Sequence, residues 1–508
     1  MSGLAWKINR LRAMSPAELL FRVWRFIYSK YEKRIILGGW KPVPSTMPSS
    51  ADPFISVELK ELLSEWNRQF ERFDKNIFEK RLLKVNLFAH LDVDISREID
   101  WHEDPDTGVV APLLYGKDID YRDNEVVGNC KTLWELSRHK HLVPLAVAYV
   151  ITGESKYVDK IVSHIDGWID QNPFGLGVHW CSSLEVSLRL IAWSFVHSLL
   201  MLRCENGLFD VVNDRDGFAQ SIYQHAYFIR HYLSRHSSAN NHLIGELTGL
   251  WVGCKVFDLG KVGRLWASQA KKELAREAEK QVFPDGVSKE QATYYHLWVS
   301  EYLLLNWLIA LRYEDDFDTS YSKRLSSMFQ FLVDIKPDRG QVPQIGDSDD
   351  GLVVEFDPDS SVNPYEDVIV TVEHIGSWAD AGRRAGTSKS FWYAAIVGVL
   401  QENTDGLPTI KNQHEPVKVY PDGGYVIFSD DLSHSVFDAG SLGYPSIAAH
   451  GHADALSVGM AFRGDWWLVD PGTYCYHTEP VWRDYFRGTG AHNTCLLYTS
   501  PSPRDRYI

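Results

Sequence analysis

The chain has 508 residues, of which 44% are hydrophobic and 23% are charged, so it is a globular protein with room for more than one domain. Its formal charge of −15 argues against a nucleic-acid-binding surface, and any anionic partner would need local cations. The six cysteines form no C-x-x-C pair, which excludes a zinc finger and a disulfide framework.

Residues 1–56 form a basic region with predicted helix. Residues 1–41 hold nine lysine and arginine residues against two glutamates, and residues 17–33 have the periodicity of an amphipathic helix. We expect this helix to pack on the main domain, with contact to an anionic membrane as the alternative. No apolar h-region follows the first residues and no apolar run approaches the length of a membrane span. The sequence as written therefore predicts a soluble, cytoplasmic protein without a recognisable signal peptide.

Residues 57–415 are predicted to be mainly helical, because apolar residues recur at spacings of three and four between short polar breaks. Clear examples are 142–152, 183–202, 218–234, 243–258, 267–282 and 294–313. Many successive helices with short joints indicate an all-α layered or toroidal domain. Arg138, His139 and Arg189 are candidate substrate-binding residues within it. Glu185 and Arg189 are four residues apart, so pairing along one helix is the alternative for Arg189.

Two polar motifs open helices in this domain. In Asn240-Asn241-His242, one side chain suffices to cap the helix, which leaves an amide and an imidazole to hold a carboxylate. In the second motif, Tyr294 and Tyr295 point about 100 degrees apart on a helix, so they cannot both face one cleft. A tyrosine at this place is either a core residue or a proton donor to a leaving sugar oxygen.

The sequence pattern changes after the helical part. The acidic loop 346–351 lacks the twelve-residue EF-hand pattern, so we expect a turn with cleft contacts and not a calcium site. In residues 416–494, short segments rich in β-branched and aromatic residues predict antiparallel strands at 420–428, 434–439, 455–462 and 466–469, with a tight turn at 463–465. An α-domain is therefore followed by a partial β-domain.

Ionisable residues alternate along the segment 448–454, at His450, His452 and Asp454. If this segment is a strand, as we expect, all three lie on one face. Three such groups are poor core material, because burying them unpaired costs free energy, so the pattern favours a functional site.

A metal site is a second possibility for this segment. Asp470 and His492 come later in the chain and would complete a site with His452, since neutral imidazoles and a carboxylate suit zinc or a similar divalent ion. The alternative is a hydrogen-bonded cluster of histidine and aspartate without metal.

Residues 495–508 begin with Cys-Leu-Leu-Tyr-Thr-Ser-Pro-Ser-Pro-Arg-Asp, which resembles the translation of a sequencing adapter. We expect this tail to be non-native, to pack poorly and to add no strand. The natural protein would then continue beyond Thr494, and its β-domain would be truncated here. A genuine polar tail is the alternative.

Together, the motifs at 240–242, 290–296, 344–351, 450–454 and 469–473 resemble, in residues and in order, those of the heparinase II/III family, which includes alginate-lyase-like members. The likeness extends from the segment MSPAELLFRVWR near the start to His492-Asn-Thr494. It implies an (α/α) toroid followed by an antiparallel β-sandwich, with the cleft between them. It also implies a polysaccharide lyase that eliminates across C4 and C5 of a uronate and leaves unsaturated uronate ends.

The resemblance implies roles for individual residues. Asn241 and His242 would neutralise the uronate carboxylate. Tyr295 would protonate the leaving O4, and His450 would remove the C5 proton or share that work with Tyr295. The metal-binding positions of the family, expected to hold a structural zinc, match His452, Asp470 and His492.

Two other functions stay open. A uronyl C5 epimerase uses the same proton abstraction but returns the proton to the opposite face. A non-catalytic polysaccharide-binding protein of exopolysaccharide assembly fits the absent signal peptide, although the presence of Asn241, Tyr295 and His450 argues against it. The expected partner is an anionic uronate polysaccharide, whether heparan-type, alginate or a bacterial exopolysaccharide. Since no dense cluster of lysine and arginine is visible, a carboxylated, less sulfated polymer is favoured.

Overall fold

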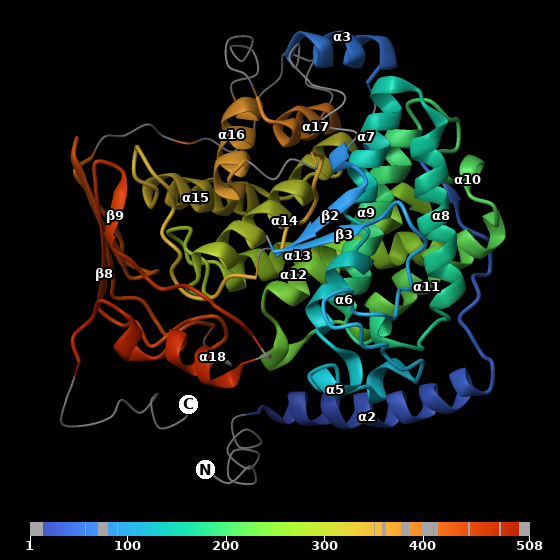
Figure 1. Cartoon of the computed structure of the whole chain (residues 1–508), viewed down its shortest axis with the longest axis horizontal. Coiled ribbons are helices and arrows are strands. Elements are labelled where there is room, and N and C mark those ends of the chain that lie inside the picture. Colours follow the sequence, from blue (N-terminus) through green and yellow to red (C-terminus); the bar gives the residue numbers. More distant parts are fainter. Residues whose placement is uncertain are drawn as a thin grey trace.

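Figure 1 shows the computed structural model, in which helices predominate up to Ile396 and an antiparallel sheet follows them. The structure describes residues 14–55, 57–69, 80–88, 90–349, 351–357, 362–376, 386–397, 410, 415–444, 448–476 and 479–496. The predicted order of a helical domain and then an antiparallel β-domain is confirmed. Of the tail at 495–508, all but the first two residues lie outside the described part of the chain, so its non-native origin stays a prediction.

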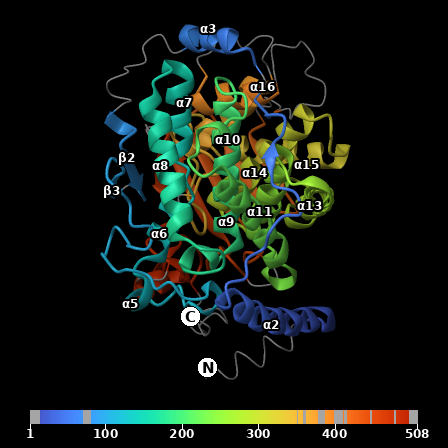
Figure 2. The ribbon, with the colours of Figure 1, turned by 90° about the vertical axis from the view of Figure 1, so that its right-hand side faces the viewer.

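The helical domain has an inner and an outer layer (Figures 1 and 2). The inner helices contact one another in chain order, and the central ones are enclosed by protein on all sides; every residue of α9 is buried. They are α7 (Leu142–Thr152), α9 (Ser183–Leu200), α12 (Asn241–Val256), α14 (Thr293–Arg312) and α17 (Ser388–Ile396). The outer helices pack on them with one face: α8 (Ser155–Gln171), α11 (Arg215–Tyr232), α13 (Gly260–Gln281), α15 (Thr319–Asp334) and α16 (Pro364–Gly376). This alternation of inner and outer helices is that of an (α/α) toroid.

The six helices predicted most clearly are all present, as α7, α9 and α11 to α14; α13 begins earlier than expected, at Gly260. The long helix α2 and several shorter elements complete the helical part. They are α2 (Pro16–Leu37), α3 (Leu59–Gln69), α5 (Asn124–Val127), α6 (Cys130–Ser137), α10 (Leu208–Val211), η1 (Gly116–Asp118), η2 (Val178–Trp180), η3 (His236–Ser238) and the paired strands β1 (Ser49–Ser50) with β4 (Phe257–Asp258) and β2 (Lys84–Leu87) with β3 (Leu91–Asp94).

Glycines on α12 let this helix approach α9 closely. Gly245, Gly249 and Gly253 recur every fourth residue and meet side chains of α9. A Cβ atom at Gly249 would lie 2.6 Å from the Cβ atom of Ser187 and 2.8 Å from its carbonyl oxygen. Any side chain at Gly249 would therefore push the helices apart, and this packing fixes the start of α12, where Asn241 lies.

The large sheet has five antiparallel strands in chain order: β5 (Val417–Tyr420), β6 (Tyr425–Ser429), β7 (Ser433–Asp438), β8 (Ser457–Phe462) and β9 (Asp465–Leu468). The predicted single strand at 420–428 is wrong, because Tyr420 pairs with Tyr425 across a tight turn that needs Gly424 at a φ of 82°. The predicted turn at 463–465 is confirmed as the connection between β8 and β9.

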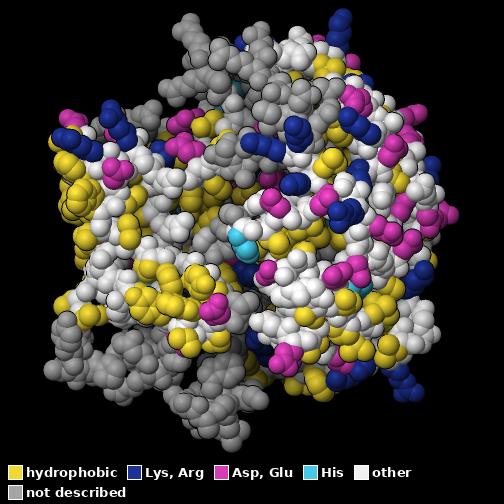
Figure 3. All heavy atoms as spheres, viewed as in Figure 1, with side chains coloured by type: hydrophobic (Ala, Val, Ile, Leu, Met, Phe, Trp, Pro, Cys, Tyr) yellow, Lys and Arg dark blue, Asp and Glu magenta, His cyan; other side chains and the backbone are white. Residues whose placement is uncertain are grey.

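The two faces of this sheet have different surroundings. The inner face contacts the end of α15, where Lys418 and Tyr420 donate hydrogen bonds to Asp334 at 2.7 and 2.6 Å. The outer face carries exposed apolar side chains, visible along the left edge of Figure 3 over β8 and β9. They include Val419, Phe428, Met460, Phe462 and Trp467. An apolar face of this kind is what a second sheet layer buries in a sandwich.

The segment 448–454 is a loop, so the prediction of a strand there is wrong. Ala448 and His450 have φ angles of 48° and 67°, which break the alternation of a strand. The loop folds against residues 443–444; a Cβ atom at Gly451 would lie 2.5 Å from the backbone nitrogen of Gly443. His450 and His452 therefore share no strand face, and their side chains reach different partners.

Candidate active site

Two inner helices begin close to the loop 448–454 and carry residues predicted to be catalytic. Asn240 is the N-cap of α12, where its side chain accepts a hydrogen bond from the backbone of His242 at 3.1 Å. Capping thus uses Asn240, and the side chains of Asn241 and His242 are left for other contacts. Tyr295 lies in the first turn of α14.

Glu290 holds Asn241 in place. The backbone N–H of Asn241 donates to Glu290 Oε1 at 2.6 Å, and its side-chain Nδ2 donates to Oε2 at 2.8 Å. Both residues are buried, and this burial raises the pKa of the Glu290 carboxyl. Asn241 Oδ1 is buried and has no hydrogen-bond partner among the described residues. One end of the Asn241 amide is therefore anchored, and the other end has its hydrogen-bonding capacity unused.

Tyr295, and not Tyr294, faces the loop of the β-domain. Its ring stacks on His450 with the ring centroids 3.6 Å apart, and its hydroxyl lies 2.8 Å from that of Tyr476. Tyr294 instead donates to the carbonyl of Gly351 at 2.9 Å. Burial, reinforced by the nearby acidic groups, raises the pKa of Tyr295 well above its usual value. The Tyr295 phenol is therefore protonated at neutral pH and suited to act as an acid.

His450 lies between two carboxyl groups. Its Nδ1 is 3.2 Å from Asp347 Oδ2, and its Nε2 is 3.7 Å from Glu290 Oε2. A hydrogen bond from Nδ1–H to Asp347 leaves a lone pair on Nε2, on the side of Glu290 and Asn241. The His450 side chain is 14% exposed, whereas Asn241 is fully buried. His450 is therefore a solvent-accessible base beside the buried amide.

Asp347 joins the catalytic cluster to the histidines behind it. Its carboxylate accepts two hydrogen bonds from Arg483, both at 2.6 Å, and one from His452 Nε2 at 2.9 Å, in addition to its contact with His450. Burial opposes ionisation of Asp347, but these hydrogen bonds outweigh it and hold the pKa of the carboxyl well below its usual range. Asp347 is thus a buried anion that orients two imidazoles at once.

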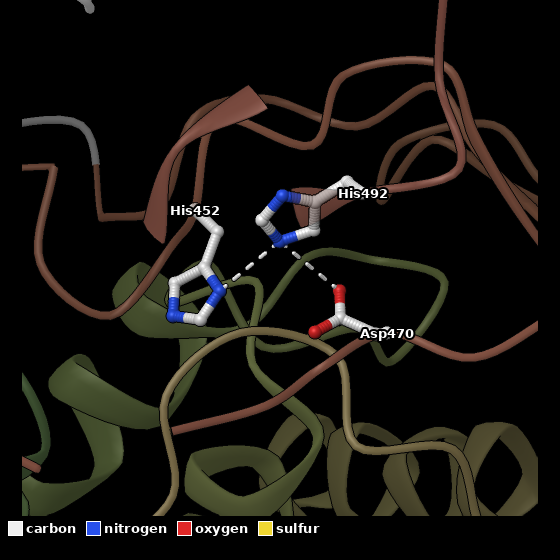
Figure 4. A group of neighbouring side chains, drawn as sticks. All are labelled: His452, Asp470 and His492. Atoms are coloured by element: carbon white, nitrogen blue, oxygen red, sulfur yellow. Dashed lines mark hydrogen bonds and ion pairs between the residues drawn. The ribbon is translucent and has the colours of Figure 1, made fainter. Parts of the chain in front are cut away.

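His452, Asp470 and His492 converge on one point (Figure 4), and one ligand atom of each lies within 4.8 Å of the others. His492 Nδ1 lies 2.8 Å from the carbonyl of Gly488, and His452 Nε2 lies 2.9 Å from Asp347, so each imidazole donates its N–H away from the cluster. The lone pairs of His452 Nδ1 and His492 Nε2 then face each other at 3.2 Å. Two lone pairs at this distance repel unless a cation or a proton lies between them.

Asp470 adds an oxygen to the same point. Its Oδ2 lies 3.5 Å from His492 Nε2 and has no hydrogen-bond partner among the described residues. Burial raises the pKa of Asp470 to about 7. A cavity of about 230 Å³, lined in part by Asp470 and His492, reaches the cluster. Two imidazole nitrogens and a carboxylate oxygen beside a cavity fit the ligand set of zinc.

His242 and Lys131 complete the surroundings of the cluster. Burial, followed by the proximity of His450, lowers the pKa of His242 to about 4, so this imidazole is neutral at pH 7. Lys131 Nζ lies 3.6 Å from the ring centroid of Tyr476 and 3.5 Å from Asp349 Oδ2. This ammonium group is partly exposed and provides a local cation next to the Tyr295–Tyr476 hydroxyl pair.

The three residues predicted to bind substrate have other surroundings. His139 and Arg189 are fully buried in the helical core, where Arg189 donates to His225 at 2.9 Å and His139 accepts from Trp193 at 2.9 Å. Arg138 is buried and donates to Glu185 at 2.7 and 3.0 Å. The structure corrects the prediction for His139 and Arg189, because inner helices enclose both, and Glu185 pairs with Arg138 instead of Arg189.

Several residues of the site were missed by sequence reasoning. They are Lys131, Glu290, Asp347, Tyr476 and Arg483. Glu290 and Asp347 belong to motifs that the sequence singled out, but without a role for either residue. For Asp347 the signal was a cluster of acidic residues beside glycines, which predicted a turn with cleft contacts but no role for this carboxylate. Tyr476 and Arg483 follow the predicted metal ligand Asp470 and gave no pattern of their own.

Comparison with known proteins covers both parts of the site. The family model described as "Heparinase II/III N-terminus" matches residues 61–356, which include Asn241, Tyr295 and Asp347. The model "Heparinase II/III-like, C-terminal" matches residues 412–506, which include His450 and the three clustered residues of Figure 4. The chain belongs to the heparinase II/III family. The family resemblance inferred from the motifs is confirmed.

Individual members of the heparinase II/III family are distant relatives. The chain is 29% identical over 247 residues to a heparin-sulfate lyase of Pedobacter heparinus, which is 46% of this chain and 35% of that protein. It is 25% identical over 416 residues to a heparin-sulfate lyase of Bacteroides stercoris, which is 77% of this chain and 57% of that protein. The matched regions thus span between about a third and somewhat more than half of these relatives.

A solved structure of the family supports the fold. The crystal structure of a heparinase III superposes on 91% of this chain and 66% of its own, with a TM-score of 0.56 and 16% sequence identity. At this identity the likeness shows the fold alone, and it agrees with the helical toroid and the antiparallel sheet described above.

Proposed function

We propose that this protein is a polysaccharide lyase that cleaves a uronate-containing polymer by β-elimination and leaves an unsaturated uronate at the new chain end. The proposal depends on one observation: the α-domain and the β-domain bring Asn241, Tyr295 and His450 together around Glu290. The names of the two relatives, both heparin-sulfate lyases, support the same class of reaction.

The first requirement is to neutralise the uronate carboxylate, because the C5 hydrogen is only weakly acidic while that group is charged. Asn241 supplies an uncharged donor for this purpose. A half-turn of the Asn241 amide, with a protonated Glu290 donating to Oδ1, is favoured by the upward shift that burial gives the pKa of Glu290. The NH₂ group of Asn241 then points where the unpartnered Oδ1 now points, toward the substrate carboxylate. His242, beside it, contributes a second neutral donor.

The second requirement is a base and an acid. His450 Nε2 takes the proton from C5, the electron pair forms the C4=C5 double bond, and the bond between C4 and O4 breaks. The Tyr295 phenol donates its proton to the leaving O4. Its hydrogen bond of 2.8 Å to Tyr476 provides a route by which the proton is replaced, while His450 loses its proton to solvent. Asp347 keeps His450 oriented and stabilises the imidazolium that forms.

We also propose that His452, Asp470 and His492 hold a structural divalent ion, with zinc as the first choice. The facing lone pairs of the two imidazoles and the unpartnered Asp470 Oδ2 support this assignment. A bound ion would stabilise the loops that carry these residues. His450 is not one of the three residues, so its work as a base is separate from metal binding.

The substrate that fits best is a carboxylated polymer with few sulfates. Among the described residues at the cluster, Lys131 is partly exposed but lies 3.5 Å from Asp349, Arg483 is paired with Asp347, and Arg138 is paired with Glu185. Several sulfates would demand several free cations in one place. Alginate, heparan sulfate and bacterial exopolysaccharides containing uronates are therefore to be compared, and we expect the less sulfated polymers to be better substrates.

The test is to incubate the protein with this panel of polymers and to follow the ultraviolet absorbance of the C4=C5 enoate. The proposal predicts a growing signal with at least one polymer, together with shorter chains on size-exclusion chromatography. Inversion at C5 without absorbance would instead identify an epimerase. Tight binding without either change would identify a non-catalytic polysaccharide-binding protein.

A further inference from the structure

The helix α2 (Pro16–Leu37) packs on the main domain with its polar side. Arg22 donates to Ser237 at 3.0 Å, and the hydroxyls of Tyr28 and Tyr227 lie 2.9 Å apart. Glu32 is buried and accepts a hydrogen bond of 2.9 Å from Tyr115. These contacts confirm the expected packing on the main domain. They also direct Arg22, Tyr28 and Glu32 inward, so the side of α2 that faces the protein is polar, opposite to the usual arrangement of a surface helix.

The outward side of α2 is apolar. Leu20, Val23, Trp24, Ile27 and Tyr31 follow the spacing of one helical face, and each is between 50% and 72% exposed in the part of the chain that the structure describes. The helix lies along one edge of the molecule (Figures 1 and 2), and Figure 3 shows hydrophobic and basic side chains along that lower edge. Monomeric soluble proteins rarely expose a continuous apolar stripe of this kind without a function.

Basic residues accompany this stripe. Arg34 is exposed, and Lys30 keeps 55% of its side chain exposed beside its contact with Asp118. Residues 1–41 carry nine lysine and arginine residues against two glutamates, in a chain whose net charge is −15. Among the residues that the structure describes, Lys30, Arg34 and Lys41 therefore place exposed positive charge on or just after this helix of an otherwise acidic protein. Among the described residues, none of the helices combines the length and hydropathy that crossing a membrane requires.

We propose that α2 docks on the surface of an anionic lipid bilayer, with the stripe from Leu20 to Tyr31 in the interface and the basic residues at the headgroups. An apolar face flanked by lysine and arginine is the pattern of helices that lie in the plane of a membrane. A second copy of this chain fits less well, because a symmetric contact through α2 would bring the basic residues of two copies together.

The docked helix would also place the candidate active site near the membrane. Ser237 accepts a hydrogen bond from Arg22 and donates one to Glu18, and it lies four residues before Asn241. Phe21 contacts His236 with ring centroids 4.9 Å apart. The polar side of α2 thus supports the segment that leads into α12, while its apolar side would face the lipid.

The experiment measures co-sedimentation of the full chain with vesicles of phosphatidylcholine alone and of phosphatidylcholine mixed with phosphatidylserine. We expect binding to the mixed vesicles that weakens as salt is raised. Leu20→Ser combined with Ile27→Ser should weaken this binding at least about tenfold, because two buried apolar side chains are lost from the interface. The matched control is Leu265→Ser, which changes an exposed leucine on α13 and should leave binding unchanged.

Three results would overturn the proposal. The first is absence of binding to the mixed vesicles. The second is binding that the double variant does not reduce. The third is a dimer in light scattering that the double variant dissociates, without vesicle binding, which would show a second copy on the stripe. An unchanged melting temperature of the double variant supports the proposal, because it shows that the stripe is free in the isolated protein. A clear fall would be a fourth result against the proposal, because it would show that another part of this chain covers the stripe.

Discussion

The two halves of the candidate site are held in place by different forces. On the helical side, Asn241, Glu290 and Tyr295 are buried, two of them at the starts of inner helices fixed by close apolar packing. On the side of the β-domain, His450 and His452 lie in an irregular loop. That loop depends on hydrogen bonds and charge, chiefly those of Asp347 with Arg483 and with both histidines.

This difference indicates how the site responds to change. Apolar packing is insensitive to charge, so the helical half should survive the loss of a metal ion or a loop histidine. The loop half should depend on the ionic state of a few groups. Substitutions in the two halves should therefore separate loss of chemistry from loss of structure, and the predictions below use that separation.

The largest effect is expected for His450→Ala, which removes the proposed base from the loop half. The rate of elimination should fall by about 10²- to 10⁴-fold, the usual contribution of a positioned proton acceptor. Bound metal and melting temperature should change little, because His450 is not one of the clustered residues of Figure 4. Steady-state kinetics measure the rate, elemental analysis measures the bound metal, and thermal melts measure the melting temperature. Metal lost from His450→Ala but kept by His452→Ala would show that the two roles are reversed.

A loss of similar size is expected for Tyr295→Phe, which removes the proposed acid from the helical half. The turnover number should fall by about 10²- to 10⁴-fold, while the ring still packs against His450. Tyr294→Phe is the matched control on the same helix turn. It loses a hydrogen bond to Gly351 and no reacting group, so its rate should stay near that of the parent. Equal losses in both variants would argue against a specific role for Tyr295.

His452→Ala should act on structure first and on activity second. Loss of one of the three proposed ligands should abolish metal binding and lower the melting temperature, because a structural ion contributes folding free energy that its ligands provide together. Activity should fall less than in His450→Ala, as the loop that carries His450 loosens. Elemental analysis measures the bound metal, and thermal melts with and without a chelator measure the change in stability. A variant that retains its metal would contradict the assignment.

A smaller and more gradual effect is expected from pH on the stability of the helical domain. Burial lowers the pKa of His164 to about 4 and those of His179 and His197 to about 3, against about 6.5 in the unfolded chain. Between pH 4 and 6.5 the unfolded state binds more protons than the folded state. The contribution of these three histidines to the free energy of unfolding is therefore complete above pH 6.5 and is lost as the pH falls toward 4. Melts at pH 7.5 and 5 should show a lower temperature at pH 5, even in chelated protein. No change would contradict the burial of neutral imidazoles.

Local signals explain why the helical half was predictable from sequence. The periodicity of α12 and α14 and the cap at Asn240 depend on neighbouring residues, so the sequence placed Asn241 and Tyr295 at helix starts correctly. The same signals predicted the helix that contains Arg189. They could not show that neighbours enclose this helix on all sides, which is why Arg189 was assigned to substrate and is found in the core.

Contacts distant in sequence explain why the loop half was predicted less well. The alternation of His450 and His452 indicated a strand, but left-handed backbone at His450 and the close approach of Gly451 to Gly443 make a loop. Asp347 gained no role because its partner Arg483 comes from a distant segment. The three residues of Figure 4 nevertheless lie close together, as expected. This could be predicted because the resemblance to the heparinase II/III family supplied information that periodicity lacks.

The most direct test of the central claim is hydrogen exchange at C5 in deuterated water, with a polymer that the parent protein cleaves. If His450 removes the C5 proton and Tyr295 protonates O4, then Tyr295→Phe should incorporate deuterium at C5 of the recovered polymer without shortening it, and His450→Ala should incorporate none. Mass spectrometry of the hydrolysed sugars measures the deuterium. Deuterium in the polymer from His450→Ala, and none from Tyr295→Phe, would assign proton abstraction to Tyr295 and contradict the division of work between the two halves.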